Sequence, residues 1–253
     1  AYKNFDDKKE SLAAGMKKAA AEIFARCNLI VSYTADDKGY ELMSGLIKEL
    51  IDKLSAEQLP VATRALTLKK TRLALKTSGQ VNFVCRVGDY DKAGIEYNGA
   101  MRILANMMNS DYLWNNVRVK GGAYGCGAAF GSYSSSLGAF SSYRDPNLEK
   151  TNEIYDKAPE YVESFNADER EMTKYVIGTI SDLDLPKTPS VKGSDSFEAY
   201  ISGLTEQMLQ KERDEVLGAT VEDIRALSGM VKAVLDDGYF CVVGNEDKIN
   251  EAK

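Results

Sequence analysis

The chain has 253 residues, a formal net charge of −6, and hydrophobic and charged fractions of 44% and 28%. This composition is typical of a globular domain, and the acidic balance argues against a general nucleic-acid binder, because neutralising phosphates requires a clustered basic surface. No apolar run reaches the roughly 18 to 20 residues needed to cross a bilayer, so membrane insertion is not expected.

The absence of histidine limits the chemistry that this chain can perform. Without histidine or paired cysteines, the chain cannot by itself form a usual zinc site, a Ser-His-Asp triad or a Cys-His dyad. The four cysteines are far apart and form no CxxC pair: Cys27, Cys85, Cys126 and Cys241. We therefore expect buried thiols without disulfides. The N-terminus shows no secretory pattern, which predicts a cytoplasmic protein, or an organellar-matrix protein if the source is eukaryotic.

The first 60 residues predict a helix, a strand and a second helix. Residues 8–26 are rich in strong helix formers, with apolar side chains at helical spacing. Residues 27–35, CNLIVSYTA, form a β-branched and aromatic run typical of a strand, and residues 40–54 return to helical periodicity. We therefore expect an α-β-α segment here.

The following 60 residues predict a connection, a strand and a long helix. Residues 61–78 are basic and polar, with some strand character. Their cations indicate an exposed linker, although they could also attract an acidic partner: Lys69, Lys70, Arg72 and Lys76. Residues 80–90 alternate as a strand, and residues 95–119 have helical spacing that places Arg118 in the last turn.

The C-terminal part predicts helices followed by a short strand at residues 238–249. The helices are expected at residues 147–165, 167–186, 196–218 and 220–236. Asn166 and Glu169 have the spacing of a capping signal, and Thr220 precedes an acidic first turn. The carboxylate-rich runs DEREMTKY and QKERDEV indicate solvated helix faces. The order of elements indicates an α+β layered fold in which strands pack on one face of helices.

Residues 115–145 differ in composition from the rest of the chain, because glycines, small residues and hydroxyls follow a basic turn. Gly121 and Gly122 fit neither phosphate-binding glycine motif, and we expect them to end the helix and to supply positive φ. The turn brings Arg118 and Tyr124 to one strand edge, where a guanidinium and a phenol could bind a peptide carbonyl or stabilise an oxyanion. An exposed arginine beside a half-buried tyrosine would be the ordinary alternative.

The small-residue run after the turn leaves two interpretations open. It could leave room for another backbone or a ligand beside it, or it could be a tightly packed hairpin. Its aromatic side chains could pack on one side or line a chamber: Phe130, Tyr133, Phe140 and Tyr143.

The motif RVKGGAYG, Arg118 to Gly125, resembles the C-terminal half of the pitrilysin and insulysin metallopeptidases, in their presequence-protease branch. It lies between SDYLWNNV and a strand ending in FSSYRDP, and NLIVSYTADDKGYE, QVNFVCRVGDY and VEDIRALSGMVKAVLDDGYFCVVGNEDKI occur in the order that the family requires. The resemblance implies peptidase-like α+β domains, each a two-layer sandwich of an antiparallel-rich sheet and helices. It divides the chain into the tail of one such domain, residues 1–60, and a C-terminal domain, residues 61–253.

The resemblance also implies a function. The N-terminal half of the same polypeptide would hold zinc through an HxxEH motif, and the two halves would close around unfolded peptides. This chain would then bind no metal and would be inactive alone. Arg118 would hold a substrate carbonyl, and Tyr124 would position substrate and stabilise the tetrahedral intermediate. Lys120, Gly121 and Gly122 would contact substrate beside them. The alternative is an inactive peptidase-like subunit that acts only through protein interactions.

Overall fold

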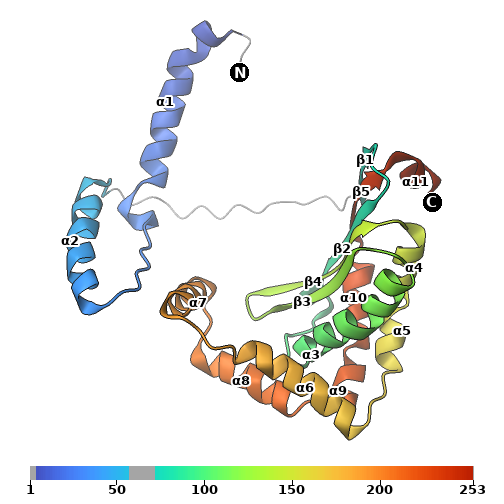
Figure 1. Cartoon of the computed structure of the whole chain (residues 1–253). Helices are drawn as coiled ribbons and strands as arrows, with labels where there is room; N and C mark the ends of the chain where they lie inside the picture. Colours follow the sequence, from blue (N-terminus) through green and yellow to red (C-terminus); the bar gives the residue numbers. More distant parts are fainter. Residues whose placement is uncertain (1–3, 57–71, 253) are drawn as a thin grey trace. The chain divides into compact units, whose positions relative to one another are not determined.

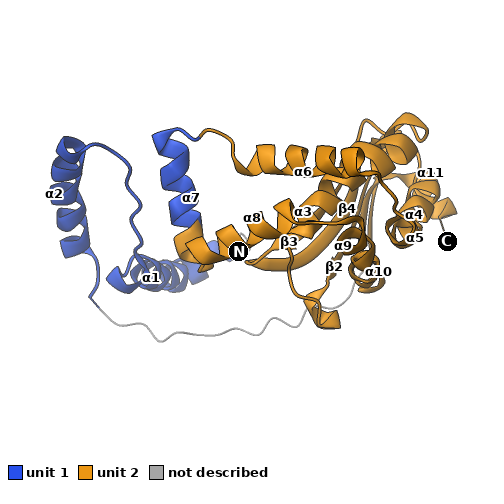
Figure 2. Ribbon diagram, turned by 90° about the horizontal axis from the view of Figure 1, so that it is seen from below, with its two compact units in different colours: residues 1–67, 187–198 blue, residues 68–186, 199–253 orange. Residues whose placement is uncertain are grey.

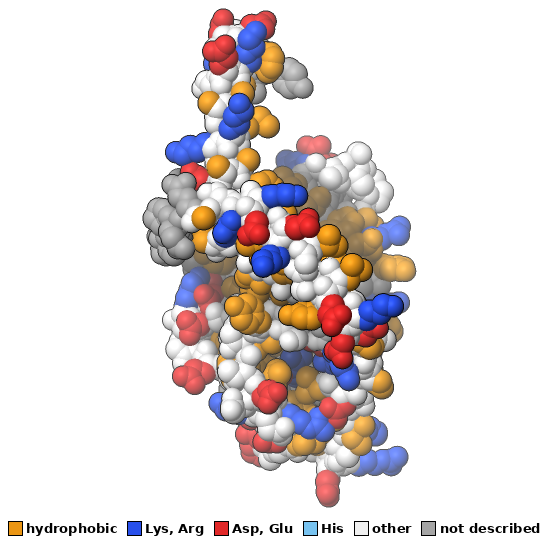
Figure 3. Space-filling view, turned by 90° about the vertical axis from the view of Figure 1, so that its left-hand side faces the viewer, with side chains coloured by type: hydrophobic (Ala, Val, Ile, Leu, Met, Phe, Trp, Pro, Cys, Tyr) orange, Lys and Arg blue, Asp and Glu red, His pale blue; other side chains and the backbone are white. Residues whose placement is uncertain are grey.

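The computed structural model describes residues 4–56 and 72–252. The chain divides into two compact units, coloured in Figure 2: unit 1 contains Ala1–Thr67 and Lys187–Glu198, and unit 2 contains Leu68–Pro186 and Ala199–Lys253. In the described ranges, no helix combines the length and the apolar character needed to cross a membrane. On the face shown in Figure 3, acidic and basic side chains are interspersed and do not gather by sign.

Unit 1 contains the two helices predicted near the N-terminus, α1 (Phe5–Ile23) and α2 (Asp37–Lys53). Asp36 caps α2, because its side chain accepts a hydrogen bond from the Gly39 amide at 2.8 Å. Neither helix has a buried residue. Ala25 is buried, and it forms a parallel bridge with Ser55.

The predicted strand at residues 27–35 is wrong. Its first residues lie in the short 3₁₀ helix η1 (Arg26–Asn28), and the residues from 29 to 36 have no regular secondary structure. Ile30 and Val31 remain exposed. A β-branched run becomes a strand only when a neighbouring strand satisfies its backbone and its side chains are packed, and within residues 4–56 and 72–252 neither condition holds for this run.

Unit 2 is built on a five-stranded sheet in the order β1-β5-β2-β4-β3 (Figure 1). The strands are β1 (Arg72–Thr77), β2 (Asn82–Asp89), β3 (Gly125–Ser132), β4 (Ser135–Asp145) and β5 (Tyr239–Asn245). β1 runs parallel to β5, and the other three pairings are antiparallel. Strand character is therefore confirmed for residues 72–77. Residues 61–71, with Lys69 and Lys70, lie outside the described residues.

The helices of unit 2 pack on one face of this sheet, which confirms the α+β two-layer class. They are α3 (Ala100–Met107), α4 (Glu149–Asp156), α5 (Ala158–Glu163), α6 (Glu169–Leu183), α8 (Glu206–Leu217), α9 (Val221–Ala226), α10 (Ser228–Asp236) and α11 (Glu246–Glu251). A further helix, α7 (Pro189–Ser202), crosses the boundary between the two units. α10 lies close to the sheet at Gly88, which has no side chain to keep the helix away. A Cβ at this position would be only 2.0 Å from the Val234 carbonyl oxygen.

Three predicted helices are each divided in two. The break before α5 falls at Lys157, just before Pro159, and the break after α7 falls at Gly203, whose φ is 70°. The third lies at Leu227, between α9 and α10. The Thr220 cap is confirmed as a capping box, whereas the cap of α6 is Asp168 with Glu171 and not Asn166 with Glu169.

The small-residue run is a hairpin, since β3 and β4 pair directly through a short turn. Its aromatic side chains do not share one side: Phe140 is fully buried against Tyr155, whereas Tyr143 is exposed.

The cysteines are less buried than predicted. No two of the four, all within the described residues, are joined by a disulfide, and Cys27 is exposed while the others are half-buried. Three of them lie in strands of a sheet that helices cover on only one face.

Candidate functional site

Arg118 is delivered by a helix that widens before it ends. α3 continues into two π-helical segments, η3 (Met108–Tyr112) and η4 (Trp114–Val119), and Arg118 lies in the second. The Lys120 amide donates to the Asn115 carbonyl at 3.0 Å, one residue further back than in an α-helix. Val117 is fully buried and anchors the last turn, so the adjacent Arg118 points outward. π-Helical turns of this kind are common at functional sites.

Gly122 turns the chain from the helix to β3. Its φ is 81°, a left-handed conformation that glycine adopts without steric cost, and its amide donates to the Arg118 carbonyl at 2.9 Å. Gly121 has a different requirement, because a Cβ at this position would lie 2.4 Å from the Val117 carbonyl oxygen. The Asn147 side chain donates to the Gly121 carbonyl at 2.6 Å and fixes the turn. Both glycines are thus explained by the path of the backbone.

The turn brings Arg118 and Tyr124 together beside a tryptophan. The Arg118 guanidinium carbon lies 4.1 Å from the centre of the Trp114 ring and 5.9 Å from that of the Tyr124 ring. Tyr124 is 65% exposed. Among the described residues, no hydrogen bond or ion pair involves the Arg118 guanidinium or the Tyr124 hydroxyl. These donors therefore remain available while stacking holds the arginine in place.

Lys120 does not join this pair, because its ammonium group donates to the Asn116 side chain at 3.3 Å, one turn back along the helix. Cys126, on β3, lies near Arg118. Burial raises the pKa of its thiol, and the positive charge of Arg118 opposes that shift. Cys126 is therefore expected to remain a protonated neighbour of the site.

Arg144 also belongs to this surface, although no sequence motif predicted a role for it. Its guanidinium carbon lies 5.7 Å from the centre of the Tyr124 ring, so that two arginines approach the same phenol. Its φ is 48°, which is uncommon for a residue other than glycine. The register of the hairpin offers a signal, because Gly125 pairs with Tyr143, and the next residues outward are Tyr124 and Arg144.

The loop after Arg144 is held by a buried carboxylate. Asp145 is fully buried and accepts hydrogen bonds from the Thr151 hydroxyl at 2.7 Å and the Asn147 amide at 2.8 Å. Its own carbonyl accepts from the Asn82 side chain at 3.1 Å. Arg144 is thus attached to a fixed backbone, which maintains its unusual conformation.

An aromatic row extends from Tyr124 onto the face of the sheet that helices do not cover. The centres of the Tyr124 and Tyr143 rings are 5.9 Å apart, and those of Tyr143 and Phe83 are 5.1 Å apart in an edge-to-face arrangement. All three side chains are exposed. We call Trp114, Arg118, Tyr124, Tyr143 and Arg144 the aromatic-arginine surface.

The edge of β3 beside this surface is less open than the small residues suggest. The Asn109 side chain donates to the Ala128 carbonyl at 2.9 Å and accepts from the Ala128 amide at 2.6 Å. A side chain of the same domain therefore occupies the outer edge of the strand at this residue. An added strand could pair with β3 only beyond Ala128.

One carboxylate of the QKERDEV run is not solvated, contrary to prediction. Glu212 is 3% exposed, accepts a hydrogen bond from the Tyr97 hydroxyl, and pairs with Arg102 at 2.6 Å. Burial, and then the hydrogen bond to Glu212, raise the pKa of Tyr97. This network links the start of α3 to α8 and is separate from the aromatic-arginine surface.

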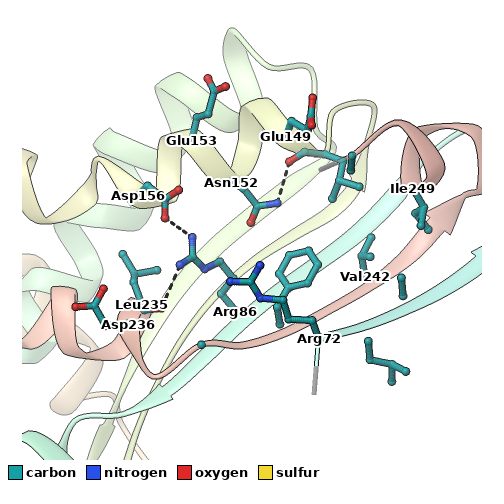
Figure 4. A pocket seen from close by; sticks show the side chains of 16 residues that line it. Arg72, Arg86, Glu149, Asn152, Glu153, Asp156, Leu235, Asp236, Val242 and Ile249 are labelled. Carbon is teal, nitrogen blue, oxygen red and sulfur yellow. Dashed lines mark hydrogen bonds and ion pairs between the residues drawn. The ribbon is translucent and has the colours of Figure 1, made fainter. Parts of the chain in front are cut away.

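A cavity of about 750 Å³ lies on the face of the sheet that the helices cover, opposite the exposed aromatic row. It lies between β1, β5, α4 and α11 (Figure 4). In it, Arg86 pairs with Asp156 and donates to the Leu235 carbonyl at 3.1 Å. None of the five predicted site residues lines this cavity. Within residues 4–56 and 72–252, no group of three His, Cys, Asp or Glu side chains could hold a metal ion.

Comparison with known proteins places the sequence in a family. Residues 72–245 match the family model described as the PreP C-terminal domain. The chain is 41% identical over 249 residues to the protein HypA of Clostridium perfringens. This alignment covers 98% of this chain and 25% of that protein. It is 31% identical over 255 residues to presequence protease 1, chloroplastic/mitochondrial, of Arabidopsis thaliana, covering 99% and 23%. The chain spans about a quarter of the length of these curated relatives.

Solved structures show the same fold. The peptidase M16 inactive domain from Pseudomonas fluorescens aligns with a TM-score of 0.54 at 14% identity, covering 81% of this chain and 51% of that one. A protease from Helicobacter pylori aligns with a TM-score of 0.54 at 15% identity, covering 80% and 52%. The resemblance carried by RVKGGAYG is thereby confirmed. The chain belongs to the family of PreP C-terminal domains, the C-terminal portion of pitrilysin-type peptidases.

Proposed function

We propose that this chain is the non-zinc-binding part of a clamshell metallopeptidase that degrades unfolded peptides. In this proposal the uncovered sheet face forms part of a chamber wall, and the aromatic-arginine surface contacts the bound peptide. The observation that carries the proposal is the pairing of a stacked guanidinium, 4.1 Å from Trp114, with the exposed Tyr124 beside it. The relatives named presequence proteases support the same conclusion.

The two side chains have complementary roles. The guanidinium of Arg118 would donate to a substrate carbonyl oxygen, because it has donors not used within the described chain. The phenol of Tyr124 would position the peptide and donate to the oxyanion that develops as the carbonyl becomes tetrahedral. Stacking on Trp114 reduces the freedom of Arg118 before substrate arrives, so less entropy is lost on binding.

The remaining predicted contacts have smaller roles. Gly121 and Gly122 leave the turn without side chains, so a substrate backbone could approach it closely. Lys120 is bonded to Asn116 and would contribute chiefly positive potential. Arg144 would add a second cation beside Tyr124.

Zinc does not fit the residues of this chain, which has no histidine. We propose that the N-terminal half of the same polypeptide holds the zinc ion and the carboxylate that activates water, and that the two halves complete one site when they close. The Arabidopsis relative is named as chloroplastic and mitochondrial. A eukaryotic form of this protein would then act in an organellar matrix, and a bacterial form in the cytoplasm.

The test uses the full-length polypeptide that contains this chain, with an unfolded peptide as substrate and with zinc content measured in parallel. Arg118→Ala and Tyr124→Phe are expected to lower kcat/KM while the protein retains its zinc. Arg170→Ala, at an exposed arginine on α6, is the matched control and should leave turnover unchanged. Unchanged turnover in both site variants would refute the proposed roles. A full-length protein without zinc or peptidase activity would instead be a noncatalytic partner subunit.

A further inference from the structure

Two cysteines face each other in the middle of the sheet. Cys85 on β2 and Cys241 on β5 are register partners in the antiparallel pairing of these strands. Residues directly opposite each other on antiparallel strands project to the same face. Their Cα atoms are about 4.5 or 5.5 Å apart, depending on the type of pair, and both separations fall within the range of about 4.4–6.8 Å that disulfides span. The separation of the two strands is therefore compatible with a bond between the two sulfurs.

The pair lies on the sheet face that helices leave uncovered. On the neighbouring strands, Leu73 of β1 lies opposite Cys241 and Ser141 of β4 lies opposite Cys85, so the four residues form one row across the sheet. Both cysteines are half-buried, so neither is enclosed in the core beneath the helices. Burial raises the pKa of Cys85, and the negative charge of a Cys241 thiolate raises it further. This influence of Cys241 on Cys85 agrees with two sulfurs that lie close together.

The other two cysteines lack this arrangement. Cys126 on β3 has Ser142 as its register partner, and both residues belong to the rows that face the helices. Cys27 belongs to unit 1 and lies in the short helix η1. The chain thus contains its own controls, one half-buried strand cysteine and one exposed cysteine, for any reaction of the facing pair.

We propose that Cys85 and Cys241 form a reversible cross-strand disulfide by exchange with a small-molecule disulfide. One protein thiol loses its proton, and the thiolate attacks the reagent to form a mixed disulfide, releasing one reduced thiol. The second protein thiolate then attacks the protein sulfur of that mixed disulfide and releases the second reduced thiol. Two protein thiols are oxidised, one reagent disulfide is reduced to two thiols, and the protein protons pass to the leaving thiolates. The inference does not depend on the proposed peptidase function.

The disulfide would join β2 to β5 and would close a loop of the chain that runs from residue 85 to residue 241. A cross-link between residues so distant in sequence restricts the unfolded chain strongly and should raise the urea concentration at which unit 2 unfolds. Reduction should return the unfolding midpoint to its original value. The modification would therefore change the stability of the sheet on its uncovered face.

The experiment incubates the folded chain, without substitutions, with oxidised glutathione, blocks remaining thiols with iodoacetamide, and maps peptides by mass spectrometry. The expected result is a linked pair of peptides containing Cys85 and Cys241, with Cys126 alkylated. When the variant Cys27→Ser/Cys126→Ser is oxidised, both of its remaining thiols should disappear and its mass should fall by two hydrogens. The variant should stay monomeric, and the urea concentration at its unfolding midpoint should rise. Adding Cys241→Ser to this variant should leave a glutathione adduct on Cys85 and should not raise the urea midpoint. Alkylation of both partners, a persistent adduct on either in the native chain, or a link only between molecules would overturn the proposal.

Discussion

The two faces of the sheet in unit 2 show how similar residues can have different uses. Val84, Phe140 and Val242 point to the helices and are almost completely buried, whereas Phe83 and Tyr143 point away and are 39% and 51% exposed. Aromatic and β-branched residues occur on both faces, so hydrophobicity does not distinguish them. The helix-covered face contributes mainly stability, while the uncovered face holds side chains that can contact another molecule.

The largest expected effect tests the helix-covered face. Phe140→Ala should lower the free energy of unfolding by about 3–5 kcal/mol, because it removes a fully buried ring and leaves a cavity. Urea unfolding followed by circular dichroism measures this change. Tyr143→Ala, an aromatic truncation on the opposite face of the same strand, should cost less than about 1 kcal/mol. Equal losses in the two variants would show that the faces are not energetically distinct.

Arg118→Ala tests the uncovered face by function. In the full-length polypeptide, kcat/KM for an unfolded peptide should fall about 10²-fold, as expected when a hydrogen bond from a charged donor to a substrate carbonyl is removed. The stability of the chain should hardly change, because the guanidinium makes no hydrogen bond or ion pair within the described residues. Steady-state kinetics and urea unfolding of the same preparation separate the two effects. A stability loss as large as that of Phe140→Ala would assign Arg118 to structure.

Tyr124→Phe should lower kcat/KM by about tenfold, because it removes one hydroxyl donor and keeps the ring that Arg118 and Arg144 approach. Tyr124→Ala should have a larger effect, since the ring is lost as well. If the two variants had the same kinetics, the ring would contribute nothing and the hydroxyl would account for the whole role.

Gly122→Ala should have a modest effect, a loss of about 1–2 kcal/mol in unfolding free energy, because alanine is strained at a φ of 81°. Gly229→Ala is the matched control. That glycine lies in α10 with no atom near the position of an added Cβ, so alanine there should be neutral or stabilising. A neutral Gly122→Ala would show that the turn before β3 adjusts its backbone easily.

Much of unit 2 could be predicted because its signals are local. The helical spacing before Arg118, the glycines after it and the Thr220 cap each depend on residues within a few positions of one another. The motif RVKGGAYG also pointed to the family, which the match over residues 72–245 confirms. The roles of Arg118, Lys120, Gly121, Gly122 and Tyr124, and the boundary near residue 60, remain predictions.

The failures concern contacts between distant residues. The run from 27 to 35 has the composition of a strand but pairs with no strand among the described residues, and Glu212 lies in a charged run yet is buried by Tyr97 and Arg102. Arg144 joins Tyr124 only through the register of the hairpin. Composition and periodicity cannot reveal such contacts, because they describe one segment at a time.

The sequence by itself determined where most of the helices form, that the backbone turns after Arg118, and that no histidine is present for zinc, because these properties depend on local sterics and residue type. Only the tertiary structure decided which face of the sheet the helices cover, that Arg118 stacks on Trp114 beside Tyr124, and that Cys85 faces Cys241. Those arrangements depend on strand order and register, which form when segments far apart in the chain bury their apolar surfaces together.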